Sequence, residues 1–147
     1  MVPVGGRVVA SYNLSLCESR LQEAWAEVDR RYTFGQVSRR LLVTCTHRLP
    51  AEQFKLYQVG RRQIADGSWV VDDDASTSIL TQLDGFVKIS NHNMLPARAI
   101  DFAVIVNGKV TWDYREYVPV GVLAVEEGLV WGGNWKMKDY PHCELPP

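Results

Sequence analysis

One stretch decides the fold: Ala99-Ile100-Asp101-Phe102-Ala103-Val104-Ile105-Val106-Asn107-Gly108-Lys109-Val110-Thr111-Trp112. Its first eight residues are apolar apart from Asp101, and their β-branched and aromatic side chains favour a buried strand. Asn107-Gly108 is the strongest short hairpin signal, because both residues accept the positive φ angles of a tight turn. Residues 109–112 return as the partner strand. We therefore expect an antiparallel hairpin with one carboxylate in its apolar strand.

The chain before this hairpin predicts two helices and a strand. Apolar residues recur at three- and four-residue steps over 15–32, which indicates an amphipathic helix, and Ser15 with Glu18 matches a capping box at its start. The run 41–46 is rich in β-formers and predicts a buried strand. Pro50 then opens a second, shorter helix at a position where its missing N–H costs nothing.

The chain after the hairpin predicts one more helix and two short strands. Asp113 can cap a helix over residues 114–127. Strands are expected at 129–131 and 140–145. Together these elements predict an α+β fold, a small and mostly antiparallel sheet with helices packed on one side.

Length and composition fit a single domain over residues 1–147, with 46% hydrophobic and 22% charged residues. The net charge of −1, without a basic block, argues against a nucleic-acid binder and offers no polybasic membrane anchor. Residues 1–10 lack the apolar segment of a signal peptide, so we expect synthesis in a cytoplasm without export by the usual route. We also expect a monomer.

Two segments carry little pattern. Residues 1–12 are expected to form a loose lead-in, and residues 61–89 a long loop over the cleft, because long loops in small domains are often functional. The Asp72-Asp73-Asp74 triplet could bind Ca²⁺, although it lacks the glycine and the distal glutamate of an EF-hand. The alternative is a solvated acidic turn.

His92, Asp101 and His142 are of the types that zinc hydrolases use, in which two imidazoles and one carboxylate leave the fourth metal position open for water. Asp139 precedes His142 by three residues, a spacing that can place a general base beside that water. Ser90 belongs to a polar cluster around His92 that can orient the imidazole.

Each of these residues also has a plainer interpretation. Asp101 could be neutralised by Arg98 or Arg48, since a buried carboxylate is costly unless it is paired or bound to a metal. Asp139 and His142 could belong to an ordinary turn with a proline. Ser90 and its polar neighbours could form a simple loop.

The cysteines form no disulfide framework and no Cys-x-x-Cys zinc pattern. Cys17 and Cys45 are expected to be buried reduced thiols. Cys143 adjoins His142, but side chains alternate along a strand, so it should point away from the metal.

These residues resemble a known family, the zinc peptidases of the D-Ala-D-Ala carboxypeptidase group, and within it the phage L-alanyl-D-glutamate endopeptidases, or endolysins. The family's usual signature is Ser-x-His, then Ala-x-Asp, then Asp-or-Glu-x-x-His. The chain matches it with Ser90-x-His92, Ala99-x-Asp101 and Asp139-x-x-His142.

Two further stretches carry the resemblance. Residues 46–53 resemble the family's Tyr-Arg-Ser-x-x-Glu-Gln segment, and residues 131–135 its Trp-Gly-Gly-x-Trp. The gap between His92 and Asp101 is two residues longer than the family's commoner one, so the extra residues must bulge out.

The resemblance implies zinc held by His92, Asp101 and His142, with Asp139 as the general base and Arg48 stabilising the oxyanion. The implied substrate is the peptide stem of bacterial peptidoglycan, cut between L-Ala and D-Glu. A lysis enzyme of this kind would wait in the host cytoplasm until another protein opens the membrane. The residues expected to contact substrate are His47, Gln53, Ser90, Trp131 and Trp135.

Alternatives remain for the function and for several residues. The same scaffold could carry a D,D-carboxypeptidase or dipeptidase acting on D-Ala-D-Ala, a cell-wall binder that does not cut, or a structural phage component. Asp139 argues against a pure binder, which needs no base. For Arg48 the plainer role is a surface salt bridge. For His47, Trp131 and Trp135 it is packing.

Overall fold

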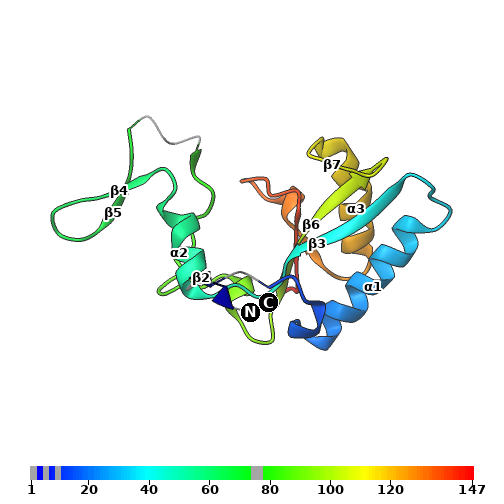
Figure 1. Ribbon diagram of the computed structural model, residues 1–147, viewed down its shortest axis with the longest axis horizontal. Coiled ribbons are helices and arrows are strands. Elements are labelled where there is room, and N and C mark those ends of the chain that lie inside the picture. Colours follow the sequence, from blue (N-terminus) through cyan, green and yellow to red (C-terminus); the bar gives the residue numbers. More distant parts are fainter. Residues whose placement is uncertain (1–2, 5–6, 9–10, 74–77) are drawn as a thin grey trace.

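The computed structural model describes residues 3–4, 7–8, 11–73 and 78–147 (Figure 1). Its elements in chain order are β1 (Pro3–Val4), β2 (Arg7–Val8), η1 (Leu14–Leu16), α1 (Ser19–Thr33), β3 (Arg39–Cys45), α2 (Pro50–Gln58), β4 (Arg61–Gln63), β5 (Trp69–Val71), η3 (Asn91–Asn93), β6 (Ala99–Val106), β7 (Lys109–Thr111), α3 (Tyr114–Glu126), β8 (Val130–Trp131), η4 (Gly132–Asn134) and β9 (His142–Glu144).

Strand β6 organises a five-stranded antiparallel sheet in the order β3-β6-β9-β8, with β7 also paired to β6. The predicted hairpin is confirmed, and Asn107 and Gly108 form its turn with φ angles of 50° and 78°. Along β6, one end pairs with β9 and the other end with β7. Asp101 lies at the β9 end of the strand.

Helices α1 and α3 pack on one face of this sheet, as predicted (Figure 1). The α+β class is therefore confirmed. One apolar core lies between the helices and the sheet. Its fully or nearly fully buried members include Leu21, Trp25, Val28, Phe102 and Tyr117.

The start of α1 differs from the predicted capping box. Ser15 lies in the short helix η1, and Glu18 is the N-cap of α1 without a side-chain cap bond. Tertiary pairing overrides the local signal, because Ala97 exchanges backbone hydrogen bonds with Leu16 (2.8 Å) and Glu18 (2.9 Å) and so holds this stretch extended.

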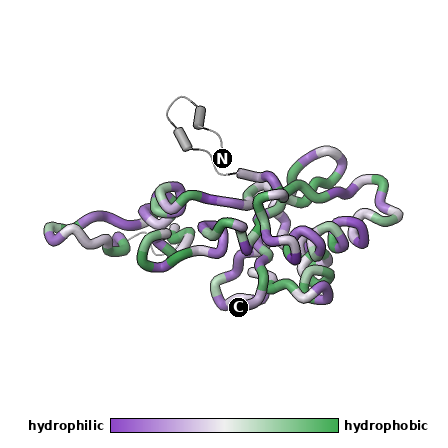
Figure 2. Tube along the Cα trace, turned by 90° about the horizontal axis from the view of Figure 1, so that it is seen from below, coloured by the Kyte–Doolittle hydropathy of each residue, from purple (hydrophilic) through white to green (hydrophobic). Residues whose placement is uncertain are grey.

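The segment 61–89 is not one long loop. Strands β4 and β5 form a hairpin whose turn contains Asp66 and Gly67. This hairpin lies at one end of the molecule's long axis, away from the five-stranded sheet (Figures 1 and 2). The Asp-Gly turn and the β-formers Trp69, Val70 and Val71 that follow it explain this hairpin. Among its described residues, Thr81 and Leu83 accept hydrogen bonds from Gln53 of α2.

The lead-in is only partly loose. Strands β1 and β2 pair with each other. The Ser11 carbonyl accepts hydrogen bonds from the backbone N–H of Thr46 (2.7 Å) and from its hydroxyl (3.0 Å). Residue 11 is therefore fixed beside β3. Among the described helices, none has the length and apolar character needed to cross a bilayer.

Candidate metal centre

Sheet pairing brings the predicted residues together. Asp101 lies opposite Cys45 of β3 and opposite His142 of β9 in the register of the sheet. His92 reaches the same point from η3, which precedes β6. The three predicted ligands thus come from three segments that only the folded sheet places side by side.

Both histidines approach the same carboxylate oxygen. His92 Nε2 lies 3.2 Å from Asp101 Oδ1, and His142 Nδ1 lies 3.1 Å from that atom. The two imidazole rings are 5.1 Å apart and nearly perpendicular. Their side chains are 2% and 7% exposed, so water competes little with these contacts.

The far nitrogen of each ring fixes its tautomer. His92 Nδ1 lies 2.7 Å from the Thr46 carbonyl oxygen, which can only accept, so this nitrogen must donate. His142 Nε2 lies 2.7 Å from Glu144 Oε2 and donates likewise. In the neutral rings, the lone pairs of His92 Nε2 and His142 Nδ1 therefore both face Asp101.

Three electron-pair donors that converge in this way require a cation between them. His92 Nε2 is buried and has no hydrogen-bond partner among the described residues, although it lies 3.2 Å from Asp101 Oδ1. Two neutral imidazole nitrogens and a carboxylate oxygen suit a transition metal, zinc included. The donor set fits a metal centre.

Without a metal, protons take this role. Burial by itself would lower the pKa of His92, but the contact with the Asp101 carboxylate outweighs burial and raises that pKa to about 10. The pKa of His142 is raised for the same reason against the same opposing burial. Burial would raise the pKa of Asp101, yet the two imidazoles hold it far below its usual range. A metal must therefore displace protons.

Asp139 stands at the open side of the centre. Its Oδ2 lies 3.9 Å from His142 Nδ1, and its side chain is 49% exposed. Burial of the carboxyl raises its pKa above the ordinary value, which favours proton uptake. Its backbone N–H donates to the Gly132 carbonyl (3.0 Å), and its own carbonyl accepts from His142 N–H (3.3 Å).

Arg48 binds the Asp101 carboxylate oxygen that the two histidines do not contact. One guanidinium nitrogen donates to Asp101 Oδ2 (3.1 Å) and the other to Gln53 Oε1 (2.8 Å). The arginine partner considered for Asp101 therefore exists alongside the two histidines, whereas Arg98 pairs with Glu18 instead (2.7 Å). The Arg48 side chain is 14% exposed, so the surface salt bridge is the wrong interpretation.

Gln53 and Ser90 occupy supporting positions. Gln53 is buried, and its amide nitrogen donates to the Leu83 carbonyl (2.9 Å) while its oxygen accepts from Arg48. The Ser90 hydroxyl accepts from the His92 N–H (3.2 Å) and caps η3. Gln53 thus fixes Arg48 and Ser90 fixes His92, and their predicted contact with substrate stays a prediction.

The remaining predicted contact residues divide into core and rim. Trp131 is 5% exposed, belongs to the apolar core and donates to the Tyr140 carbonyl (2.9 Å). His47 is 7% exposed, and burial lowers its pKa. Both side chains are buried, and their predicted contact with substrate stays a prediction. Trp135 is partly exposed and lies 4.9 Å from the His142 ring, so it borders the centre.

All three cysteines are free and buried, as predicted for Cys17 and Cys45. Cys143 lies in the apolar core, on the opposite side of β9 from His142. Cys45 is nearer the site than expected, with Sγ 3.7 Å from His92 Nδ1 and 3.4 Å from Arg48 Nη2. It contacts the nitrogen of His92 that already donates to Thr46, which favours a supporting role over ligation.

Thr46 and Glu144 contact the two histidines, and neither was predicted from the sequence. Glu144 follows His142 by two residues on a strand, so both side chains leave the same face, and that periodicity could have identified it. Thr46 acts through its backbone carbonyl, for which the sequence holds no signal. Met94 and Leu95, between His92 and Asp101, are exposed, and the predicted bulge of two extra residues stays a prediction.

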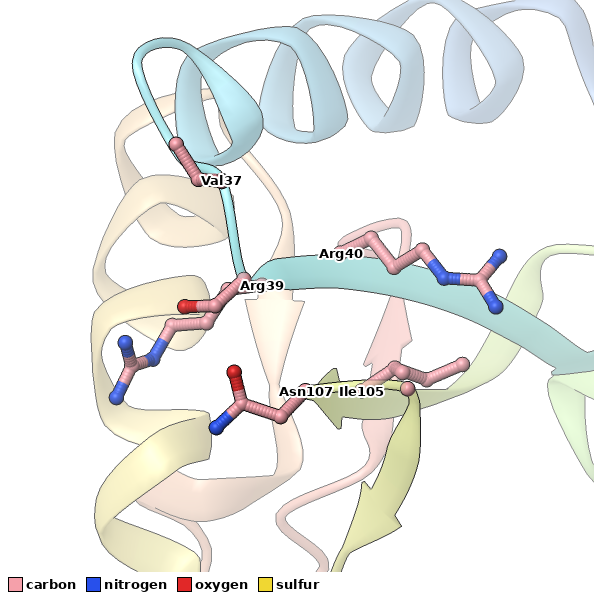
Figure 3. A pocket seen from close by; sticks show the side chains of 7 residues that line it. Val37, Arg39, Arg40, Ile105 and Asn107 are labelled. Atoms are coloured by element: carbon pink, nitrogen blue, oxygen red, sulfur yellow. The ribbon is translucent and has the colours of Figure 1, made fainter.

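Other features lie apart from this centre. A hollow of about 330 Å³ opens at the far end of β3 and β6, where Arg39 and Arg40 point in opposite directions (Figure 3). Asp72 pairs with Arg62 (3.2 Å). The calcium site stays a prediction, because Asp74 lies outside the described residues.

The chain is similar to a peptidase family in sequence and to a solved peptidase in fold. Residues 85–145 match the model of a peptidase family described as D-alanyl-D-alanine carboxypeptidase. The crystal structure of Serratia marcescens L-Ala D-Glu endopeptidase ChiX is similar in fold, with a TM-score of 0.60 and 22% identity over 91% of this chain and 84% of that one. No curated protein matches the sequence. The family match spans the segment that carries His92, Asp101, Asp139 and His142.

Proposed function

We propose that this chain is a zinc peptidase that hydrolyses the peptide stem of bacterial peptidoglycan, with the bond between L-Ala and D-Glu as its target. The observation that carries the proposal is the convergence of two imidazole lone pairs on Asp101, with a half-exposed carboxylate beside them. A metal held only for structure is usually enclosed by four protein ligands, whereas this donor set leaves a side open toward Asp139.

Each residue has a distinct part in the proposed reaction. His92, Asp101 and His142 would hold the zinc, which would supply Lewis-acid chemistry: polarisation of the scissile carbonyl and a bound water with a pKa of about 7. Asp139 accepts the proton of the attacking water and returns it to the leaving amine. Arg48 fixes Asp101, and its remaining N–H groups are proposed to face the oxyanion.

The substrate assignment draws on both comparisons. The fold likeness to an L-Ala D-Glu endopeptidase and the sequence resemblance support cleavage between L-Ala and D-Glu. The family description favours a second candidate, a carboxypeptidase acting on D-Ala-D-Ala. The released termini distinguish the two: the endopeptidase leaves L-Ala on the glycan side, and the carboxypeptidase releases free D-Ala.

The test uses purified peptidoglycan and three proteins: wild type, Asp139→Asn, and Asp29→Asn as a matched control on the distant helix α1. We expect wild type to bind one zinc and clear the suspension. Loss of the base should slow clearing by about 100- to 10,000-fold in Asp139→Asn while its zinc content is retained. Wild type that binds zinc and the wall without releasing peptides would refute catalysis and support a cell-wall binder.

We further propose a role in phage-driven host lysis, with a monomeric enzyme that waits in the host cytoplasm. The support is the resemblance to endolysins, together with a site assembled from a single chain. Expression in bacteria with and without a membrane-permeabilising protein tests this role. Lysis should require both components, and rapid lysis by the enzyme alone would contradict the proposal.

A further inference from the structure

Glu144 is a part-buried carboxylate that the proposed reaction does not use. Its side chain is 21% exposed and lies on β9, two residues after His142 and on the same face of that strand. Glu144 Oε2 lies 2.7 Å from His142 Nε2, which is among the shorter polar contacts around the site. A carboxylate placed there has to be explained, because burial of a charge is unfavourable without a partner.

Glu144 also faces the segment that carries the other histidine. Burial raises the pKa of Glu144, but the contact with His142 and the smaller effect of the Asn91 side chain, in η3, outweigh burial and lower that pKa below the ordinary value. Asn91 precedes His92, and its backbone carbonyl accepts from Arg98 N–H (3.0 Å) at the start of β6.

We propose that Glu144 is a positioning residue that fixes His142 with Nδ1 toward the metal. This inference rests on the proposed function, since it concerns the same metal centre. An imidazole can present either nitrogen, and a carboxylate acceptor at Nε2 requires the hydrogen there. The lone pair is then left on Nδ1, the nitrogen 3.1 Å from Asp101 Oδ1.

The proposal predicts a defined loss of metal affinity. Removal of a carboxylate that orients a ligating histidine typically costs 10- to 100-fold. We expect Glu144→Ala to weaken zinc binding by that factor. Glu144→Gln should lose less, because its amide oxygen can still accept from Nε2–H. Some loss should remain, because the amide can also rotate its NH₂ group toward the ring and stabilise the wrong tautomer.

The measurement is zinc affinity by competition with a chelator, on wild type, Glu144→Ala, Glu144→Gln and Glu116→Ala. Glu116 is a matched control, because it is also a part-buried glutamate in an ion pair, with Arg39 at the far end of β3. A second readout is the His142 Nε2–H proton in the NMR spectrum of the zinc-bound protein. It should be protected from solvent exchange in wild type and exposed in Glu144→Ala.

The outcomes separate this inference from the proposed function. Weaker zinc binding and an unprotected Nε2–H in Glu144→Ala, with Glu116→Ala within twofold of wild type, support the inference. Zinc binding by Glu144→Ala within twofold of wild type would overturn it and leave the peptidase proposal standing. Equal losses in both alanine variants would also overturn it, because the effect would then be one of general stability. A wild-type protein that binds no zinc would overturn both.

Discussion

The glycine at position 132 gives the sharpest test of how the proposed base is held. A Cβ added at Gly132 would overlap the Asp139 carbonyl oxygen and lie 3.1 Å from Asp139 Cβ. That carbonyl accepts from the His142 N–H, and the Gly132 carbonyl accepts from the Asp139 N–H. A methyl group at Gly132 would therefore displace Asp139, the proposed base, and through the backbone hydrogen bond also His142, a proposed metal ligand.

The expected size of the effect follows from this contact. Relief of the overlap in Gly132→Ala requires the Asp139 backbone to move by roughly 1 Å, a displacement that can cost about 100-fold in rate. The overpacking itself should cost about 1–3 kcal/mol of stability. In a domain of this size, each 1 kcal/mol lowers the unfolding midpoint by about 2–4 °C.

The assay compares Gly132→Ala with Gly128→Ala. Gly128 follows α3 with φ +84°, and an added Cβ there meets only Arg20, at 3.6 Å. The left-handed conformation should cost about 1–2 kcal/mol, so both variants lose similar stability. At saturating zinc, only Gly132→Ala should lose peptidoglycan-clearing activity. A Gly132→Ala protein that clears peptidoglycan at the wild-type rate, or a Gly128→Ala protein that loses as much clearing activity, would show that the space at Gly132 does not position Asp139.

Three further predictions concern protonation, a supporting arginine and the core. The raised pKa of His92 adds stability that is fully present below pH 6.5 and is lost as pH rises through about 10. The chelator-treated protein should therefore melt at lower temperature at pH 10 than at pH 7. A melting temperature that rises from pH 7 to pH 10 would contradict a raised pKa. Arg48→Lys should slow clearing by about 10-fold or more, because an ammonium cannot bridge Gln53 and Asp101 as the planar guanidinium does, and an unchanged rate would argue against this bridge. Leu21→Ala should lower the free energy of unfolding by about 2–5 kcal/mol, since the side chain is fully buried. Zinc affinity measured below the melting range should stay at the wild-type value. A loss of zinc affinity in Leu21→Ala would show that the core and the metal centre are coupled.

Elements with local sequence signals were predictable from the chain alone. The apolar run of β6, the Asn107-Gly108 turn, and Pro50 at the start of α2 all appear where their patterns predicted. The types and spacing of His92, Asp101, Asp139 and His142 indicated metal chemistry before any fold was known. Local patterns succeed here because turn geometry, strand alternation and proline's fixed φ act over a few residues.

Contacts between particular atoms depend on the folded sheet and could not be predicted from local patterns. The start of α1 moved because Ala97 pairs with the residues before it, and no local pattern encodes a partner so distant in sequence. The tautomers of both histidines depend on Thr46 and Glu144, which reach them through strand pairing and through a backbone carbonyl. Residue types can suggest a metal centre, but the direction of each lone pair is set by groups that converge only when the sheet has formed.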